Sequence, residues 1–425
     1  MHFAPLALTL LSLAIWLYLA TLHGAFWRLR DFDNDPVAQA SAGASPQYEL
    51  PADLPSVIAI VPARTEAATI GQTLTSLFQQ TYRGEFSIIL VDDHSEDRTA
   101  QIAGQITQEL KAESRIEIHS APPLPQGWTG KLWALNEGVL HSFSSTATLG
   151  CAPTTAVSPG APTTGRMTAN HLCTDPKYYW FTDADIIHAP DALHRLVARA
   201  EHDNLDLASL MVLLQAQTFP ERALIPAYLF FFMKLYPPRW IANPQTRTAG
   251  AAGGCILLRS QALQRIGGLA AIRSEVIDDC ALARAVKRTG GKIWMGLTRA
   301  SISLRAYTTF GEIRDMIART AFTQLGYSPV LLLATVMAMF LTYLAPVSFL
   351  FTHDPTTRIL AGCTWLLMSL LYLPTIRFYH LSPLWAATLP LAALFYTYAT
   401  VLSAFRHYAG QGAQWKGRPL TRVTR

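Results

Sequence analysis

Residues 178–189 read YYWFTDADIIHA and decide the fold of the chain. Three aromatic strand formers precede Thr182, and two isoleucines resume the apolar run, which predicts a buried strand that ends at two carboxylates. Asp183 and Asp185 can offer oxygen ligands to a hard divalent cation, Mg²⁺ or Mn²⁺, that keeps positions open for phosphate oxygens. The alternative is a turn with two solvated aspartates.

Two strand–loop–helix patterns precede this stretch. Apolar runs at 56–61 and 86–91 each end in a polar loop, PARTEA at 62–67 and DDHSEDRT at 92–99, and a helical pattern follows each loop. Open α/β sheets bind ligands at the carboxyl ends of their strands. The loops therefore predict a nucleotide site, with solvated loop side chains as the alternative. Its candidate residues are Pro62, Arg64, Glu66, Asp92 and Asp93.

Charged residues also stand at two predicted helix starts. Lys131 follows a loop rich in proline and glycine, where the helix dipole would help it to meet a phosphate; a surface lysine is the alternative. Asp278 and Asp279 open the helix VIDDCALARA at 276–285. The dipole accounts for one of these carboxylates, and the other can serve as general base for an acceptor hydroxyl.

The composition indicates a catalytic domain joined to membrane segments. Half of the 425 residues are hydrophobic, only 15% are charged, and the mean hydropathy is +0.21. Arg28 and Arg30 follow the first apolar run and place the catalytic domain in the cytoplasm. Three C-terminal spans would put the tail at 406–425 outside the cell, whereas its basic residues favour the cytoplasmic side. The sequence therefore does not decide the side of the tail. The predicted transmembrane runs are 6–22, 329–351, 359–376 and 384–405.

Other features exclude some functions. The net charge of +5 is modest, and no basic run alternates with aromatic residues, so we expect no nucleic-acid partner. The five cysteines lack zinc-binding spacing and indicate free thiols. The apolar run at 223–241 predicts either a helix or lid at the membrane interface or a buried core helix. Residues 142–177, rich in Ser, Thr, Ala, Pro and Gly, predict a flexible surface insertion.

The motifs occur in the order seen in inverting, membrane-anchored family 2 glycosyltransferases, which the chain resembles from about residue 55 to residue 418. They are PARTEA at 62–67, VDDHSEDRT at 91–99, GKLWALNEG at 130–138, DAD at 183–185, CILLRSQALQRIGG at 255–268 and DD at 278–279. Within that family the chain resembles the hopene-associated glycosyltransferases at RTAFTQLGYSP (319–329), FYHLSPLWAATLPLA (378–392) and WKGR (415–418). The segment 142–177 is the main departure.

The resemblance implies the GT-A fold, a Rossmann-like α/β sheet that binds a nucleotide-sugar, with transmembrane helices at both ends of the chain. Arg64, Glu66 and Asp92 would line the nucleotide site, with Asp92 reaching the base, expected to be uracil. Lys131 would approach the donor. Asp183 and Asp185 would form the Mg²⁺ or Mn²⁺ motif, with Asp185 as the more direct ligand.

The resemblance also implies that Asp279 deprotonates the acceptor for attack on the anomeric carbon with inversion. The family more often has Glu-Asp here, so Asp278 is a conservative departure. The Gln-x-x-Arg-Trp motif of processive synthases is not evident, which favours a single transfer.

The expected organisation is an anchor at 1–27, a linker at 28–54, a GT-A domain at 55–325, a C-terminal transmembrane region at 326–405 and a basic tail at 406–425. The expected function is the transfer of one hexose from a UDP-sugar to a hopanoid at the cytoplasmic face of a bacterial-type inner membrane. Polyprenyl phosphate, diacylglycerol or carotenoid acceptors are alternatives, as is a non-catalytic membrane scaffold.

Overall fold

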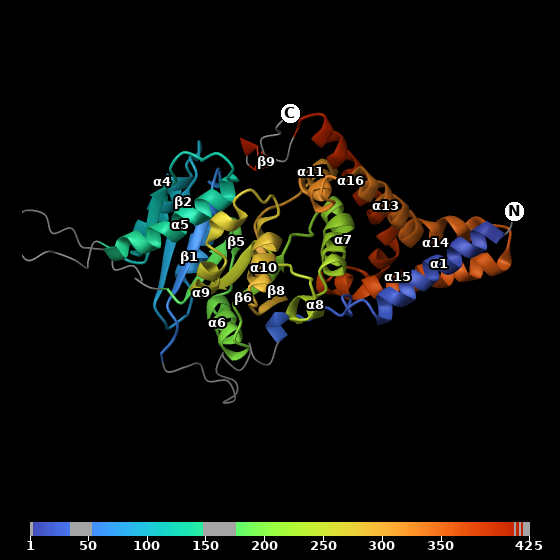
Figure 1. The fold of residues 1–425 in the computed structure, drawn as a ribbon, viewed down its shortest axis with the longest axis horizontal. Coiled ribbons are helices and arrows are strands. Elements are labelled where there is room, and N and C mark those ends of the chain that lie inside the picture. The colour runs from blue at the N-terminus through green and yellow to red at the C-terminus, as the bar shows by residue number, and fades with distance from the viewer. Residues whose placement is uncertain (1–2, 35–52, 148–175, 412–413, 416–417, 420–425) are drawn as a thin grey trace, which may run out of the picture.

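An eight-stranded mixed sheet forms one half of the computed structural model, and long apolar helices form the other half (Figure 1). The structure describes residues 3–34, 53–147, 176–411, 414–415 and 418–419. The strands of the sheet are β1 Val57–Ala63, β2 Phe86–Asp92, β3 Ile116–Ser120, β4 Tyr178–Thr182, β5 Ile186–Ile187, β6 Leu207–Leu213, β7 Cys255–Arg259 and β8 Ile293–Ser303. Their spatial order is β3-β2-β1-β4-β7-β6-β8-β5. The α/β class predicted from the sequence is confirmed.

β1 lies inside the parallel half of the sheet, between β2 and β4. Its side chains alternate between two buried clusters, because successive residues of a strand point to opposite faces. Ile58 and Ile60 belong to one cluster, whereas Val57 and Val61 belong to the other. Parallel pairing aligns the carboxyl ends of β1, β2 and β4, so that the loops after them meet at one edge. The connecting helices are α3 Ile70–Phe78, α4 Thr99–Glu109 and α5 Gly130–Ala147.

The strand β7 reverses direction and pairs antiparallel with both β4 and β6. Its first residue, Cys255, stands opposite Thr182 at the end of β4. This register brings the glycine-rich segment before β7 next to the Asp-x-Asp stretch after β4. The helices of this half are α6 Ala192–His202, α7 Phe219–Leu235, α8 Pro238–Ala242, α9 Ser260–Arg265, α10 Asp278–Arg288, α11 Phe310–Ala318 and α12 Ala321–Gln324, with the 3₁₀ turn η3 Leu269–Ile272.

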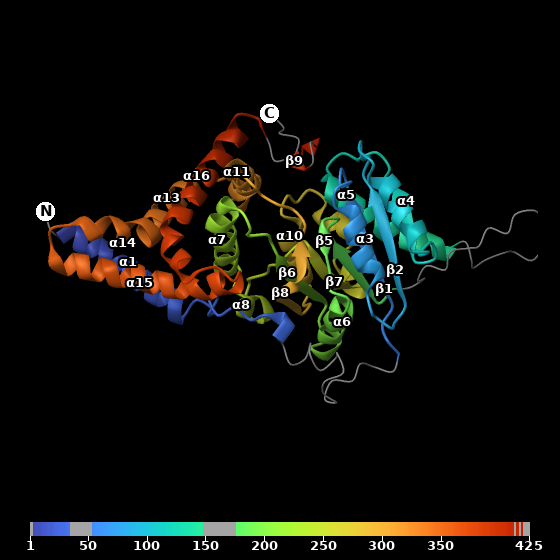
Figure 2. The ribbon, with the colours of Figure 1, turned by 180° about the vertical axis from the view of Figure 1, so that it is seen from behind.

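Four helical segments of the described chain are long and apolar enough to cross a membrane, which matches one predicted N-terminal and three predicted C-terminal spans. They lie together, away from the sheet (Figure 2). The first is α1 Phe3–Thr21, and the second joins α13 Pro329–Met339, the π-turn η4 Phe340–Leu344, α14 Ala345–Ser348 and η5 Phe349–Phe351. The others are α15 Pro355–Phe378, and η6 Pro383–Thr388 with α16 Leu389–Tyr408.

A buried tryptophan of α1 compensates for a proline in the second segment. Pro346 has no backbone N–H to donate to the carbonyl of Thr342, four residues earlier. The Trp16 side chain is fully buried, and its Nε1 donates to this carbonyl at 2.7 Å. The same indole packs edge-on against the Tyr343 ring, with centroids 5.5 Å apart. The hydrogen bond therefore holds α1 against the interrupted helix.

Helix α7 connects the sheet to the apolar helices. It begins with a capping box, in which the Thr218 hydroxyl accepts from the Glu221 N–H and the Glu221 carboxylate accepts from the Thr218 N–H. Further along α7, the Phe231 ring lies 5.5 Å from Tyr343 and 4.9 Å from Tyr396, centroid to centroid. Of the two roles expected for 223–241, the buried core helix fits these contacts, since most of α7 is buried.

Part of the predicted linker is bound to the sheet. Phe32 is buried, and the Asp33 carboxylate accepts from Thr298 Oγ1 at 2.8 Å and from the Arg299 N–H at 2.7 Å. Arg299 also forms an ion pair with Asp31 at 2.7 Å and contacts His380 Nε2 at 2.7 Å. The end of β8 is thereby joined to the segment after α1 and to the turn after α15. Most of the expected linker, residues 35–52, lies outside the described residues.

The predicted insertion begins later than residue 142, because α5 continues through Ala147. The composition of 142–147 does not prevent the helix from extending, and residues 148–175 lie outside the described residues. Before the second apolar segment, α11 and α12 are separated by a break at Arg319 and Thr320.

Replacement of Trp16 by Phe should lower the free energy of unfolding by about 1–3 kcal/mol, since it leaves a buried carbonyl without its donor. Trp133→Phe is the control, because Trp133 Nε1 donates to the Pro122 carbonyl at an exposed site where water can replace it. Thermal unfolding of both variants in detergent micelles measures the difference. Equal melting temperatures for the two variants would contradict the role given to Trp16.

Candidate active site

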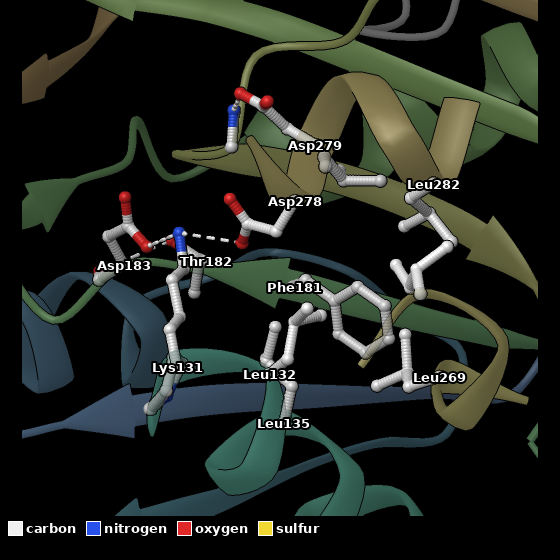
Figure 3. A pocket seen from close by; sticks show the side chains of 14 residues that line it. Lys131, Leu132, Leu135, Phe181, Thr182, Asp183, Leu269, Asp278, Asp279 and Leu282 are labelled. Atoms are coloured by element: carbon white, nitrogen blue, oxygen red, sulfur yellow. Dashed lines mark hydrogen bonds and ion pairs between the residues drawn. The ribbon is translucent and has the colours of Figure 1, made fainter. Parts of the chain in front are cut away.

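Lys131 lies among carboxylates at the edge where the parallel strands end (Figure 3). Its Nζ is 2.7 Å from Asp183 Oδ1 and 3.6 Å from Asp278 Oδ2. Burial alone would lower the pKa of Lys131, but the neighbouring carboxylates of Asp183 and Asp278 outweigh it and raise the pKa. Lys131 is therefore a fixed positive charge at the start of α5. Apolar side chains of α5, β4, η3 and α10 lie beneath it (Figure 3).

The Asp279 carboxylate is held by the backbone at the start of α10. Its Oδ2 accepts from the Gly253 N–H at 2.9 Å and its Oδ1 accepts from the Cys280 N–H at 2.7 Å. Burial and the charge of Asp278 raise the pKa of Asp279 to about 6. A carboxyl group with this pKa is ionised near neutral pH and can accept a proton.

Glycine at position 253 lets the backbone pass close to both charged groups. A Cβ atom there would lie 3.3 Å from Asp279 Oδ2 and 3.3 Å from Lys131 Nζ, which is a tight contact for both. The segment before β7 thereby brings its backbone N–H to the candidate base.

Asp185 is within reach of the charges of two other acids, Asp183 and Glu66. Burial and the charges of Asp183 and Glu66 raise the pKa of Asp185 to about 6. Carboxylates that repel one another in this way suit a divalent cation, which would neutralise them. In the described part of the chain, no group of three His, Cys, Asp or Glu side chains converges as a metal site. A cation here would need donor phosphate oxygens or water besides Asp183 and Asp185.

The loops after β1 and β2 are tied together by side chains of the second loop. Thr65 N–H donates to Ser95 Oγ at 3.0 Å, and Ala67 N–H donates to Asp97 Oδ2 at 3.0 Å. Thr65 adopts φ +54°, which a residue other than glycine rarely does. These contacts give Ser95 and Asp97 a role in shaping the loop beside the site.

The residues expected to bind the nucleotide form two groups. Pro62, Glu66, Lys131 and the aspartates of the Asp-x-Asp motif line one large cavity, together with Asp279. Arg64, Asp92 and Asp93 do not line this cavity and cluster at the end of β2. Asp93 is fully buried, and its backbone carbonyl accepts from Arg64 Nη1, while the Asp92 carboxylate accepts from the Ser95 hydroxyl. Their part in nucleotide binding stays a prediction.

The large cavity has a volume of about 630 Å³ and extends from the aspartates to the apolar helices. Its far wall consists of apolar and aromatic side chains from α7, α11, α13 and α16. Among them are Tyr228, Phe231, Ile317, Val336, Met339 and Tyr396. One continuous space therefore joins charged groups suited to a nucleotide-sugar and a surface suited to a lipid.

Four residues of the cavity wall were missed by sequence reasoning. Arg305 lies after β8, and its charge opposes the raised pKa of Asp185. Tyr228, Tyr307 and Arg319 line the space between Asp279 and the apolar helices. Only Arg319 stands in a motif that carried the resemblance. Tyr228 falls within the apolar run at 223–241, which predicted a helix but no place in the site. Arg305 and Tyr307 belong to no local pattern, since the fold brings them to the site from the segment after β8.

Two solved structures align with this chain. The mannosyltransferase PcManGT from Pyrobaculum calidifontis, solved in complex with GDP-Man and Mn²⁺, aligns with a TM-score of 0.51 and 15% identity over 92% of this chain and 99% of that chain. TarS residues 1–349 from S. aureus in complex with UDP aligns less well, with a TM-score of 0.36 and 13% identity over 76% and 72% of the two chains. No protein of curated function matches the sequence significantly.

The likeness to the mannosyltransferase confirms the expected GT-A fold and, at this identity, shows the fold alone. The sequence profile described as "Glycosyltransferase like family 2" matches residues 55–323. Because that profile spans more than half of the chain, the protein belongs to glycosyltransferase family 2.

Proposed function

We propose that the protein transfers one sugar, with inversion, from a nucleotide-sugar to a lipid taken from the membrane. The observation that carries the proposal is the cavity of about 630 Å³, which joins Asp185 and Asp279 to the faces of α13 and α16. An enzyme acting on two soluble substrates would have no need for an apolar wall continuous with its membrane helices.

The donor would lie at the charged end of this cavity. Lys131 keeps its positive charge and holds the Asp183 carboxylate in place. Asp183 and Asp185 would hold Mg²⁺ or Mn²⁺, which when bound supplies charge neutralisation for the leaving diphosphate. Binding of Mn²⁺ and a nucleotide-sugar by a protein of the same fold supports this assignment. Arg64 and Asp92 would bind the base, for which we propose uracil, and the buried Asp93 would hold the Arg64 guanidinium in place.

The acceptor hydroxyl would lie beside Asp279. The Asp279 carboxylate accepts the hydroxyl proton as the oxygen attacks the anomeric carbon, and the bond from that carbon to the diphosphate oxygen breaks on the opposite face. The backbone N–H groups of Gly253 and Cys280 fix the carboxylate during this step. Attack opposite the leaving group inverts the configuration, and one base suffices for a single transfer.

For the acceptor we propose a hopanoid, supported by the motifs at 319–329 and 378–392 and by the apolar cavity wall. Polyprenyl phosphate, diacylglycerol and carotenoid acceptors would use the same chemistry. The catalytic half would face the cytoplasm at a bacterial-type inner membrane, as the arginines after α1 indicate. A non-catalytic scaffold is disfavoured, because burying both Asp185 and Asp279 costs free energy that a scaffold has no reason to keep.

Nucleotide release by the purified protein in lipid nanodiscs tests this function. A panel of UDP- and GDP-sugars is supplied with Mn²⁺ or Mg²⁺, with and without a hopanoid that carries a free hydroxyl. Release that requires both the metal and the hopanoid supports donor and acceptor together. If another lipid stimulates metal-dependent release and the hopanoid does not, that lipid is the acceptor in place of the hopanoid. If no combination of donor and lipid gives release, the proposed transferase activity is refuted.

Asp279→Asn should lower kcat by about 10²- to 10⁴-fold, since the amide cannot accept the proton. Donor affinity, measured by calorimetry, should stay within about threefold, because the side chain keeps its shape and its distance from the diphosphate. Asp278→Asn is the matched control, with a smaller loss of kcat, as Asp278 contacts Lys131 and not the backbone pair around the base. Equal losses of donor affinity and kcat in Asp279→Asn would exclude the base assignment.

The pH profile of kcat should fall on the acid side through about pH 6, where the Asp279 carboxylate becomes protonated. Because the charge of Asp278 contributes to the raised pKa, Asp278→Asn should move this acid limb to lower pH. Turnover measured from pH 4.5 to 8 in both proteins checks the shift. An acid limb that stays in place in Asp278→Asn would assign it to another group.

Asp185→Asn should abolish the gain in donor affinity that Mn²⁺ gives. The variant should fold at least as stably as the parent, since it removes one of three mutually repelling acids. Donor titrations with Mn²⁺ and with EDTA, beside thermal unfolding, measure both effects. Retained Mn²⁺ dependence would mean that Asp185 does not bind the cation.

A further inference from the structure

His188 is a buried histidine that the mechanism above does not use. It follows β5 directly and is only 2% exposed, with its ring 4.6 Å from the Trp180 ring, centroid to centroid. Burial lowers the pKa of His188 to about 3, so the imidazole is neutral at physiological pH. It follows Asp185 by three residues and contacts Thr182, the residue before Asp183.

The hydrogen bonds around His188 define its tautomer. Thr182 Oγ1 lies 2.7 Å from His188 Nε2 and 3.1 Å from the Gly254 carbonyl oxygen. We assign the single hydroxyl proton to the Gly254 carbonyl, which can only accept and is nearer than the Asp183 carbonyl at 3.5 Å, so that the hydroxyl accepts from Nε2–H. Nδ1 is then an acceptor, and Ser301 Oγ donates to it at 3.0 Å. With this tautomer, both ring nitrogens of His188 and the Thr182 hydroxyl each have a hydrogen-bond partner.

This network connects the two halves of the candidate active site. Thr182 immediately precedes Asp183, and Gly254 immediately follows Gly253, whose N–H donates to Asp279 Oδ2. The bonds from His188 through Thr182 to Gly254 therefore join the Asp-x-Asp turn to the segment that holds the candidate base. The pairing of β4 with β7, in which Thr182 stands opposite Cys255, also joins these two segments, whereas the bond from Leu304 N–H to the Asp185 carbonyl at 2.7 Å holds only the turn.

We propose that His188 is a positioning residue that fixes the separation between the Asp183–Asp185 turn and Asp279. The inference rests on the proposed function, in which the diphosphate held by the aspartates must lie in line with the hydroxyl held by Asp279. A displacement of about 1 Å between such groups can cost about 10²-fold in rate. The bond from Nε2–H to Thr182 positions the turn, whereas the bond from Ser301 to Nδ1 only orients the imidazole ring.

Two substitutions of His188 separate this role from simple core stability. In His188→Gln, the side-chain amide can place a donor near the former Nε2 and keep the bond to Thr182. In His188→Asn, the shorter side chain can keep an acceptor near the former Nδ1 for Ser301 but cannot reach Thr182. Each variant loses one buried hydrogen bond, so the two should have similar melting temperatures.

We expect His188→Asn to lower kcat per folded molecule by about 10- to 100-fold, and to weaken Mn²⁺ binding about tenfold or more. His188→Gln should stay within about threefold of the parent in both respects, since it keeps the contact that orients the turn. Mn²⁺ affinity is measured by electron paramagnetic resonance without donor. Thr182→Val and Thr182→Ser repeat the comparison at the other end of the bond, should a His188 variant fail to fold.

Equal kcat and equal Mn²⁺ affinity in the folded Gln and Asn variants would overturn the inference and leave His188 a core residue. A parent protein that binds Mn²⁺ but transfers no sugar would refute the proposed function, and the Mn²⁺ affinities would still decide the inference. A parent that transfers sugar without binding Mn²⁺ would refute the metal assignment. The ratio of the kcat values of His188→Gln and His188→Asn would then decide whether His188 is a positioning residue. A parent that does neither refutes both.

Discussion

Repulsion between carboxylates is the constraint on which the active site depends. Asp183, Asp185 and Asp279 are brought to one sheet edge and partly removed from water, where like charges repel strongly. Lys131 offsets part of this repulsion, but the pKa values of Asp185 and Asp279 stay raised, first because both groups are withdrawn from water and then because of the neighbouring carboxylates. The fold keeps these groups together by many backbone hydrogen bonds, so the site stays arranged before a substrate arrives.

Helix α7 connects the charged site at the sheet edge to the apolar half of the molecule. α7 lies between them, with its aromatic rings packed against Tyr343 and Tyr396 and its inner face lining the cavity. Buried residues of the sheet, of α7 and of the apolar helices belong to one core cluster. The part of the cavity that we propose for the acceptor therefore depends on the packing of the two halves against each other.

Sequence reasoning recovered the features with a local signature. The apolar run before Asp183, the helix start at Asp278 and the four long apolar helices each follow from periodicity and composition within one segment. It missed His188, whose partners Thr182 and Ser301 lie on different strands, and the docking of Phe32 on the sheet. It also placed the start of the insertion too early. Such features depend on which strands become neighbours in the sheet. No local pattern in the sequence predicts that the antiparallel β7 lies between β4 and β6.

The contacts of Arg299 with Asp31 and His380 hold the sheet in a fixed position relative to the apolar helices. Because β8 is bound to the segment after α1 and to the turn after α15, the sheet cannot tilt freely over the apolar helices. In the proposed arrangement, with the apolar helices in a bilayer, the candidate base Asp279 stands at a constant distance from the bilayer surface. A hydroxyl of a lipid acceptor held too close to the hydrocarbon, or too far above it, would then miss Asp279. Selection among membrane lipids would thus depend on the reach of the headgroup as well as on its chemistry.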